Sequence, residues 1–369
     1  MKSVAVNRIT KRQAGHWEKV QGRSPISLMH VLVILCLMVG VAVANGAASV
    51  KIMSQNMDAG TDYHYALDLG LPSGVDATLA ELQASRIPER AALLGARIAA
   101  ELPDLVALEE VSLWRVGPTP LTATRTLYDQ LQLLLAALAA NGASYNVVMV
   151  NNLTDVALPG STGALRLTDR DALLIRSGPR PAAVQLSDVQ AHSYRAGLNI
   201  AGLGAKQGWI SANVHSGNRT FRLAVTHLES PIPGFPLATD VQLAQTAELL
   251  LSQPYLLLPV AICGDFNSDA DFGTGIDATP SVGLIEAAGY ADSWKVANPG
   301  DPGFTWPFYL EDQTPPNFFA TSAPYERIDL FFSRGLRVVS VNQVLAPAPS
   351  GTLPSYGSDH AGVIATFGF

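Results

Sequence analysis

Short apolar segments that end in acidic, amide or imidazole side chains recur along this chain of 369 residues. Each segment is rich in Val, Ile, Leu and Ala and is bounded by Gly, Pro, Ser or Asn, a pattern typical of buried β-strands. Polar groups at the ends of buried strands are costly unless they are paired or bind a cation. In chain order these groups are Asn56, Glu110, His227, Asp265 with Asn267, and Asp359 with His360, and Asp329 lies inside a further strand.

Composition narrows the class of protein. Charged residues make up only 15% of the chain and hydrophobic residues 48%, which excludes a disordered acidic or basic chain. The length allows two ordinary domains or one large sandwich. The formal net charge of −7 argues against a protein that coats nucleic acid, although an enzyme that touches DNA briefly remains compatible with it.

The N-terminus predicts export. Six Lys and Arg residues precede an apolar run over 29–44, which is short for a membrane span and ends in Ala42-Val43-Ala44. We therefore expect residues 1–44 to be a cleaved signal peptide, with an uncleaved membrane anchor as the alternative, and the protein to be secreted or periplasmic. Removing six of 24 cations and one of 31 anions leaves 18 against 30, a net charge of −12.

Periodicity and turn residues predict alternating helices and strands with no linker. The one remaining cysteine after the signal, Cys263, is expected to be buried in a strand. Segment 60–83 is a candidate lid over the cleft that the polar strand ends are expected to form. Helices are expected at 86–101, along the Leu127–Leu138 leucine stripe, and at 240–252 and 282–288. Strands are expected at 105–111, 145–150, 172–176, 208–214, 219–227, 256–264, 327–332, 336–345 and 362–367.

In type and order, the polar strand ends resemble the endonuclease/exonuclease/phosphatase superfamily of metal-dependent phosphoesterases. The matching stretches, between about Val50 and Phe367, are PDLVALEEV, THLES, GDFNSD, GFTW, ERIDLFF and GSDHAGV. The resemblance implies an α+β fold: a four-layer α/β/β/α sandwich of two packed mixed β-sheets with helices on the outer faces. Since Asn56 and His360 would have to share one site, residues 45–369 are predicted to form a single catalytic domain.

The resemblance also implies a metal site. Glu110 takes the place of the family's metal-binding glutamate, with Asn56 as a second ligand and Asp359 as a third, as in some members. Oxygen ligands of this kind suit Mg²⁺, with Mn²⁺ or Ca²⁺ as alternatives. Glu109 stands where the family usually has glutamine. Because adjacent residues of a strand point to opposite faces, only one of the two glutamates is expected to enter the cleft, and we assign Glu110.

The remaining residues receive catalytic roles through the same resemblance. His360, oriented by Asp329, is expected to be the general base. Asp265 and Asn267 would position the nucleophilic water and a phosphate oxygen, and His227 would be a second donor or the acid for the leaving group. Either Asp169 or Asp171 is expected to support His227, and the sequence leaves that choice open.

The resulting expectation is an exported, divalent-metal-dependent phosphoesterase that hydrolyses phosphodiester or phosphomonoester bonds with metal-activated water. Its partner would be a small phosphoester, a lipid headgroup or a nucleic acid, and it is expected to be a monomer without an obligate protein partner. An extracellular nuclease acting on DNA or RNA is the alternative within the class. A catalytically inactive binding protein on the same fold is the alternative outside it.

Overall fold

The computed structural model describes residues 49–61, 63, 72–179, 181–200, 203–253, 258–271, 277–308, 324–350, 352 and 354–369. Ala47–Phe369 forms one compact unit. The predicted signal peptide at 1–44 lies outside the described residues, and so does most of the 60–71 part of the candidate lid. Among the described residues, no helix is both long and apolar enough to cross a membrane.

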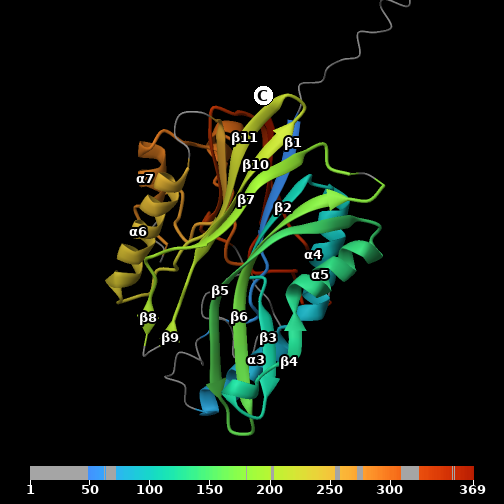
Figure 1. Cartoon of the computed structure of the whole chain (residues 1–369), viewed down its shortest axis with the longest axis vertical. Coiled ribbons are helices and arrows are strands. Elements are labelled where there is room, and N and C mark those ends of the chain that lie inside the picture. The colour runs from blue at the N-terminus through green and yellow to red at the C-terminus, as the bar shows by residue number, and fades with distance from the viewer. Residues whose placement is uncertain are drawn as a thin grey trace, which may run out of the picture. The chain divides into compact units, whose positions relative to one another are not determined.

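Two mixed β-sheets form the centre of this unit (Figure 1). In the first sheet β1 runs parallel to β2 and the other pairs are antiparallel. Its strands, in spatial order, are β15 (Arg337–Val344), β16 (Gly362–Gly368), β1 (Ser49–Asn56), β2 (Leu105–Glu109), β6 (Ala164–Ser177), β3 (Leu113–Gly117) and β4 (Arg125–Asp129), and β5 (Ser144–Pro159) also pairs with β6.

The second sheet is mixed in the same way, because β11 runs parallel to β12 while its other pairs are antiparallel. A separate two-stranded ribbon joins β8 (Asn199–Ile200) to β9 (Leu203–Gly204). The strands of the second sheet, in spatial order, are β13 (Ala291–Asp292), β14 (Asp329–Arg334), β12 (Val260–Asp265), β11 (Arg219–His227), β10 (Gly208–Ser216) and β7 (Gln185–Ser193).

Side-chain alternation sorts the apolar residues into layers. Ile52 and Phe331 face the core between the two sheets, whereas their neighbours Met53 and Phe332 face outward against helices. Cys263 lies in the inter-sheet core and is fully buried, as predicted. The strands are apolar on both faces because both faces are covered.

Helices cover both outer faces, so the predicted four-layer sandwich is confirmed (Figure 1). On the first sheet, α4 (Ile87–Glu101) and α5 (Gln130–Ala140) pack through Leu94, Leu134 and their apolar neighbours. On the second sheet, α6 (Pro236–Ser252) and α7 (Ser281–Ala287) pack in the same way. The remaining helical elements are α3 (Pro72–Ala84), α8 (Ser293–Ala297) and the 3₁₀ turn η1 (Pro120–Thr122).

Several predicted boundaries were wrong. Leu127 belongs to β4 and not to the leucine-rich helix, which begins at Gln130 after the N-cap Asp129. Strand β6 begins at Ala164, eight residues before the predicted start, and β3, β4 and β7 were not predicted at all. Strand β7 (QLSDVQAHS) lies at the sheet edge and is largely exposed, so its sequence lacks the apolar run that identifies a buried strand.

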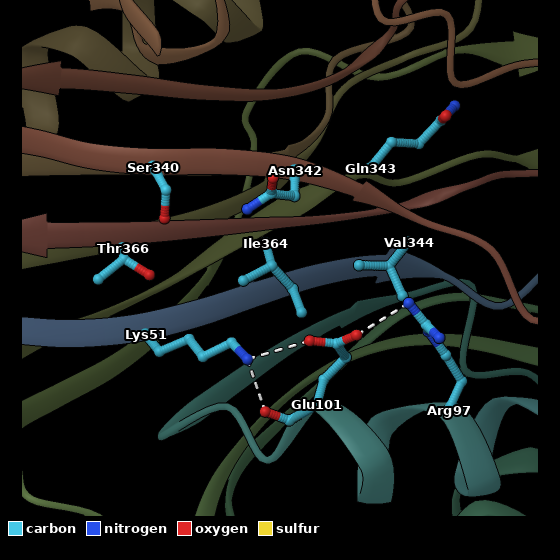
Figure 2. A pocket seen from close by; sticks show the side chains of 9 residues that line it. All are labelled: Lys51, Arg97, Glu101, Ser340, Asn342, Gln343, Val344, Ile364 and Thr366. Atoms are coloured by element: carbon cyan, nitrogen blue, oxygen red, sulfur yellow. Dashed lines mark hydrogen bonds and ion pairs between the residues drawn. The ribbon is translucent and has the colours of Figure 1, made fainter. Parts of the chain in front are cut away.

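A polar cavity of about 340 Å³ lies on the outer face of the first sheet, beside the end of α4 (Figure 2). There the Lys51 ammonium donates to the carbonyl oxygen of Glu101 at 2.6 Å and to its carboxylate at 3.1 Å, while Arg97 pairs with the same carboxylate at 2.8 Å. Lys51 thus satisfies a carbonyl oxygen at the C-terminal end of the helix, where a cation is favourable. The polar strand ends follow the inner face instead, so this cavity is separate from them.

Candidate active site

The polar residues gather where the carboxyl ends of the parallel strands meet. Register pairs Asn56 of β1 with Glu109 of β2, and His227 of β11 with Asp265 of β12. Strand β14 runs antiparallel to β12, so its first residue, Asp329, pairs with Asp265. Segments from both sheets therefore contribute to one edge of the sandwich.

Alternation directs these side chains between the sheets. Ile52 and Cys263 face the inter-sheet core, so Asn56, four residues after Ile52, and Asp265, two residues after Cys263, continue the same face. Both are buried, and Nδ2 of Asn56 donates to Oδ2 of Asp265 at 2.9 Å. This hydrogen bond joins the two sheets at the site.

Glu110 enters the site because the chain leaves the strand before it. Glu110 has φ of 53°, a left-handed conformation that ends β2. Its carboxylate accepts from Asn56 Nδ2 at 3.0 Å and from the backbone N–H of Ala59 at 2.8 Å. The side chain predicted to bind metal therefore lies beside Asn56 and Asp265.

Of the two adjacent glutamates, Glu110 belongs to a group that could hold an ion, whereas Glu109 lies beneath the site. Glu109 is fully buried and accepts a hydrogen bond from Ser54 Oγ at 3.1 Å. Burial first, and then the carboxylates of Asp329 and Asp265, raise the pKa of Glu109 well above its usual value. The turn at Glu110 breaks strand alternation, so both glutamates reach the same carboxylate cluster, Glu109 beneath and Glu110 at the rim.

Asn56 bridges carboxylates in this structure. Its Nδ2 donates to Glu110 and Asp265, and its Oδ1 accepts from the backbone N–H of Asp58 at 2.8 Å. The amide thus positions Glu110, and direct ligation of a metal by Asn56 stays a prediction.

His360 and Asp329 form a close pair. His360 Nδ1 lies 2.9 Å from Asp329 Oδ2, and the backbone N–H of Asp329 is held by Thr305 Oγ1 at 3.1 Å. The other ring nitrogen, Nε2, lies 3.9 Å from Asp265 Oδ2. Burial alone would lower the pKa of His360, but the carboxylates of Asp329, Asp359 and Asp265 outweigh it and raise the pKa well above its usual value.

His227 lies between two aspartates. Its Nε2 is 3.8 Å from Asp265 Oδ2, and its Nδ1 is 3.9 Å from Asp171 Oδ1. Asp171 is fully buried, and among the described residues neither its carboxylate oxygens nor His227 Nδ1 has a hydrogen-bond partner. Asp169 instead accepts from Ser112 Oγ at 3.5 Å, and burial raises its pKa to about 6. Asp171 is thus the carboxylate placed to orient His227.

Asn267 occupies a tight turn after β12. Its φ is 45°, and its backbone N–H donates to Asp265 Oδ1 at 2.9 Å. Its side chain donates to the carbonyl oxygen of Leu228 and accepts from Ser230 Oγ, both at 2.9 Å. Gly264, at φ 142°, lies so close to Thr226 that an added Cβ would clash with its carbonyl oxygen. The turn therefore depends on local contacts that hold Asn267 in an uncommon conformation.

The donor set fits a hard divalent cation. Two groups could hold an ion with ligand atoms within 4.8 Å of one another: Glu110, His227 and Asp265, or Asp265, Asp329 and His360. Asp359 Oδ1 is buried without a hydrogen-bond partner, and burial, with the nearby Asp58 and Glu110 carboxylates, raises the pKa of Asp359 to about 7. Closely spaced oxygen ligands with uncompensated negative charge suit Mg²⁺, Mn²⁺ or Ca²⁺.

The sequence did not identify Arg90 or Asp58 as part of this region. Arg90 of α4 is buried and pairs with the Asp58 carboxylate at 2.9 Å. It also donates to the carbonyl oxygens of Met57, Asp58 and Gly357, so it holds the turns that carry Asn56 and Asp359. A lone arginine on a helix gives no sequence signal of such a role.

Comparisons with known proteins identify the family of the chain. The model of the Endonuclease/Exonuclease/phosphatase family matches residues 53–360. A search of curated proteins gave no match.

Solved structures show the same fold. An endonuclease/exonuclease/phosphatase from Beutenbergia cavernae has 21% identity and a TM-score of 0.54, covering 87% of this chain and 72% of its own. A family protein from Leptotrichia buccalis has 15% identity and a TM-score of 0.53, covering 87% and 100%. TDP2 from D. rerio, solved with a single-strand DNA product, has 16% identity and a TM-score of 0.51, covering 87% and 99%. Since the family match spans most of the sequence, the chain belongs to the endonuclease/exonuclease/phosphatase family.

Proposed function

We propose that this protein is an exported, divalent-metal-dependent phosphodiesterase in which water attacks phosphorus directly, without a covalent enzyme intermediate. The observation that carries the proposal is the convergence of the His360–Asp329 pair, His227, Asp265 and Glu110 at one edge of the two sheets. Buried polar groups at this density cost stability, which a protein without turnover has no physical reason to retain.

In this proposal, cation binding and hydrogen bonding to the phosphate are carried out by different groups of residues. Glu110 and Asp359, with Asn56 beside them, would hold the cation. A bound divalent cation would supply positive charge that neutralises the non-bridging oxygens of the phosphate and lowers the pKa of the surrounding carboxylates and of His360. Asn267 and His227, on the second sheet, would donate hydrogen bonds to phosphate oxygens where charge develops.

His360 would accept the proton of the attacking water. Because Nδ1 is directed at Asp329, Nε2 is the nitrogen that faces Asp265 and is available as a base. Asp265 would orient the same water molecule. His227, on the other side of Asp265, would protonate the leaving group.

Charge and surface favour a small or lipid phosphoester over tight binding of a nucleic-acid backbone. The predicted mature chain carries a net charge of −12, which repels polyanions. The loop after His227 and the first turn of α6 expose Phe235 and Leu237, at 36% and 52% of their surface, and Ser230 of the loop contacts Asn267. An apolar segment next to the site suits a substrate with an apolar part. The structural similarity to TDP2 with a DNA product keeps nuclease action as the second candidate.

One panel of substrates tests the proposal. The purified chain from residue 45 onward is incubated with bis-p-nitrophenyl phosphate, sphingomyelin, inositol phosphates, plasmid DNA and RNA, each with Mg²⁺, Mn²⁺, Ca²⁺ or EDTA. We expect hydrolysis that EDTA abolishes and that His360→Ala reduces by about 10²–10⁴-fold. His215→Ala is the matched control, because His215 of β10 pairs with Ser187 on β7 and Thr220 on β11 and not with the site residues. The proposed function would be overturned if no substrate is hydrolysed with any of the metals, or if His360→Ala keeps full activity.

Export is tested separately. When residues 1–369 are expressed in a bacterial host, the protein should be recovered outside the cytoplasm, and its N-terminal residue should be Asn45. Recovery of the intact chain in the membrane fraction would favour the uncleaved anchor.

A further inference from the structure

Helix α6 places the amide of Gln242 behind the two turns that carry the catalytic residues of the second sheet. Gln242 is fully buried on the face of α6 that also buries Val241, Leu249 and Leu250. A buried amide is costly unless its donors and acceptors are satisfied. The partners of Gln242 therefore indicate why a glutamine occupies this position.

The amide nitrogen of Gln242 bridges the two turns. Its Nε2 donates to the carbonyl oxygen of Glu229 at 2.8 Å and to that of Asn267 at 2.5 Å, with the carbonyl of Phe266 at 3.3 Å. Glu229 follows His227 at the end of β11, and Asn267 follows Asp265 at the end of β12. One NH₂ group thus links the backbone of both turns.

The amide oxygen fixes the orientation of the side chain. Gln242 Oε1 accepts from Thr279 Oγ1 at 2.5 Å and from Ser281 Oγ at 2.7 Å. Carbonyl oxygens can only accept, so the three carbonyls on the other side require the nitrogen there. The five contacts therefore determine a single orientation of the amide.

The hydrogen bond from Gln242 stabilises a turn whose backbone conformation is unfavourable. Asn267 is in the left-handed region at φ 45°, which costs free energy for a residue with a side chain. Its side chain already ties it to Leu228 and Ser230 in the neighbouring turn, and Gln242 adds a second tie through the backbone. The distance between His227 and Asn267 depends on both ties.

We propose that Gln242 is a positioning residue that holds the His227 turn and the Asn267 turn in register, and that it does so without touching substrate or metal. The proposal rests on the proposed function, in which these two side chains stabilise the transition state. In the proposed function the cation is held by Glu110 and Asp359 with Asn56 beside them, and Glu110 is placed by contacts with Asn56 and Ala59, so metal affinity should not depend on Gln242.

Gln242→Glu tests this role, because a carboxylate keeps the size and the contacts to Thr279 and Ser281 but cannot donate to three carbonyl oxygens. Gln253→Glu is the matched control: Gln253 is also buried at the end of α6, but its amide donates to Leu249 and Ser252, away from the site. We expect Gln242→Glu to lower kcat by about 10–100-fold with little change in KM, and Gln253→Glu to leave kcat unchanged.

Two readouts do not depend on turnover. Hydrogen exchange of peptides that cover 226–232 and 264–270 should be faster in Gln242→Glu than in the unmodified protein and in Gln253→Glu. The dissociation constant for Mn²⁺, measured by electron paramagnetic resonance, should be unchanged in both variants. If Gln242→Glu does not fold, Thr279→Val, which removes one donor to Oε1, should show the same exchange pattern to a smaller degree.

The outcomes separate the two proposals. If no substrate is turned over but exchange increases in both peptides, the positioning role stands and the proposed function fails. Unchanged exchange in both peptides, or a kcat within twofold of that of the unmodified enzyme, would overturn the role of Gln242.

Discussion

At the scale of single residues, the pairing of His360 with Asp329 decides how the site can move protons. The carboxylate at 2.9 Å from Nδ1 holds the proton on that nitrogen and leaves Nε2 toward Asp265. It is also the main group that raises the pKa of His360 against the effect of burial. Orientation and pKa therefore depend on the same carboxylate.

Asp329→Asn should change both properties. Without the carboxylate the pKa of His360 falls, so the acid limb of the pH profile of kcat/KM should move to lower pH. The maximum rate should fall by about 10²–10⁴-fold, because the ring loses its fixed orientation. Asp240→Asn, on the exposed side of α6, is the control. An acid limb that does not move would contradict this assignment.

The adjacent glutamates give a second residue-scale prediction. Glu110→Gln should abolish binding of Mn²⁺ in a direct titration, because it removes a charged ligand at the rim. Glu109→Gln should leave metal binding intact and raise the melting temperature of the metal-free protein. The pKa of Glu109 is raised, so ionising it costs the folded state free energy as pH rises above its usual value. The increase in melting temperature caused by Glu109→Gln should therefore be larger at about pH 8 than at about pH 5.

Loss of metal binding in Glu109→Gln, with metal binding retained in Glu110→Gln, would contradict these different roles of the two glutamates.

The sequence indicated the position of the carboxylates but not their directions, because these depend on the left-handed turn at Glu110. Backbone φ at a single non-glycine residue leaves no pattern in the sequence. The choice between Asp169 and Asp171 was open for a similar reason, since it depends on the direction of β6 at the site.

At the scale of elements, the buried strands were predictable and the exposed ones were not. Strands β11, β12 and β16 are buried over most of their length and were predicted at nearly their full length. Strands β3, β4 and β7 have at most one fully buried position each, so only their hydrogen bonding to neighbours defines them. These segments form strands because they pair with neighbouring strands of the sheet, and not because their own sequence favours a strand.

Helix α3 lies in the segment that the sequence suggested as a lid. In the described part of that segment, Leu82 is fully buried and packs with Val75, Ile87 and Trp114. A helix with such contacts contributes to the fold. The idea that residues 60–83 set specificity stays a prediction, but deleting the whole segment would also remove part of the core.

Leu82→Ala measures this contribution. It should lower the free energy of unfolding in urea by about 2–5 kcal/mol, because it leaves a cavity in a packed cluster. Leu121→Ala removes the same atoms from a side chain that is 92% exposed in η1, and should change stability by less than about 0.5 kcal/mol. Equal effects of the two substitutions would show that α3 does not pack as described.

At the scale of the whole molecule, negative charge is concentrated where the sheets meet. Burial raises the pKa of Asp169 to about 6 and those of Glu229 and Asp359 to about 7. A carboxyl whose pKa is higher in the folded than in the unfolded protein favours folding at low pH. That stability is lost as the pH rises from the usual carboxyl pKa to the raised one. The metal-free protein should therefore lose stability between about pH 4 and pH 7.

A bound cation should reverse this loss, because its ligands must be deprotonated and it binds more tightly as the pH rises. The rise in melting temperature caused by saturating Mg²⁺, relative to EDTA, should thus be larger at about pH 8 than at about pH 5. Each tenfold gain in affinity adds about 1.4 kcal/mol to the stabilisation at a fixed, saturating concentration. In Glu110→Gln the Mg²⁺-dependent rise should disappear at both pH values. An equal rise at both pH values in the unmodified protein would mean that the cation binds away from the buried carboxylates, and the metal site described here would be wrong.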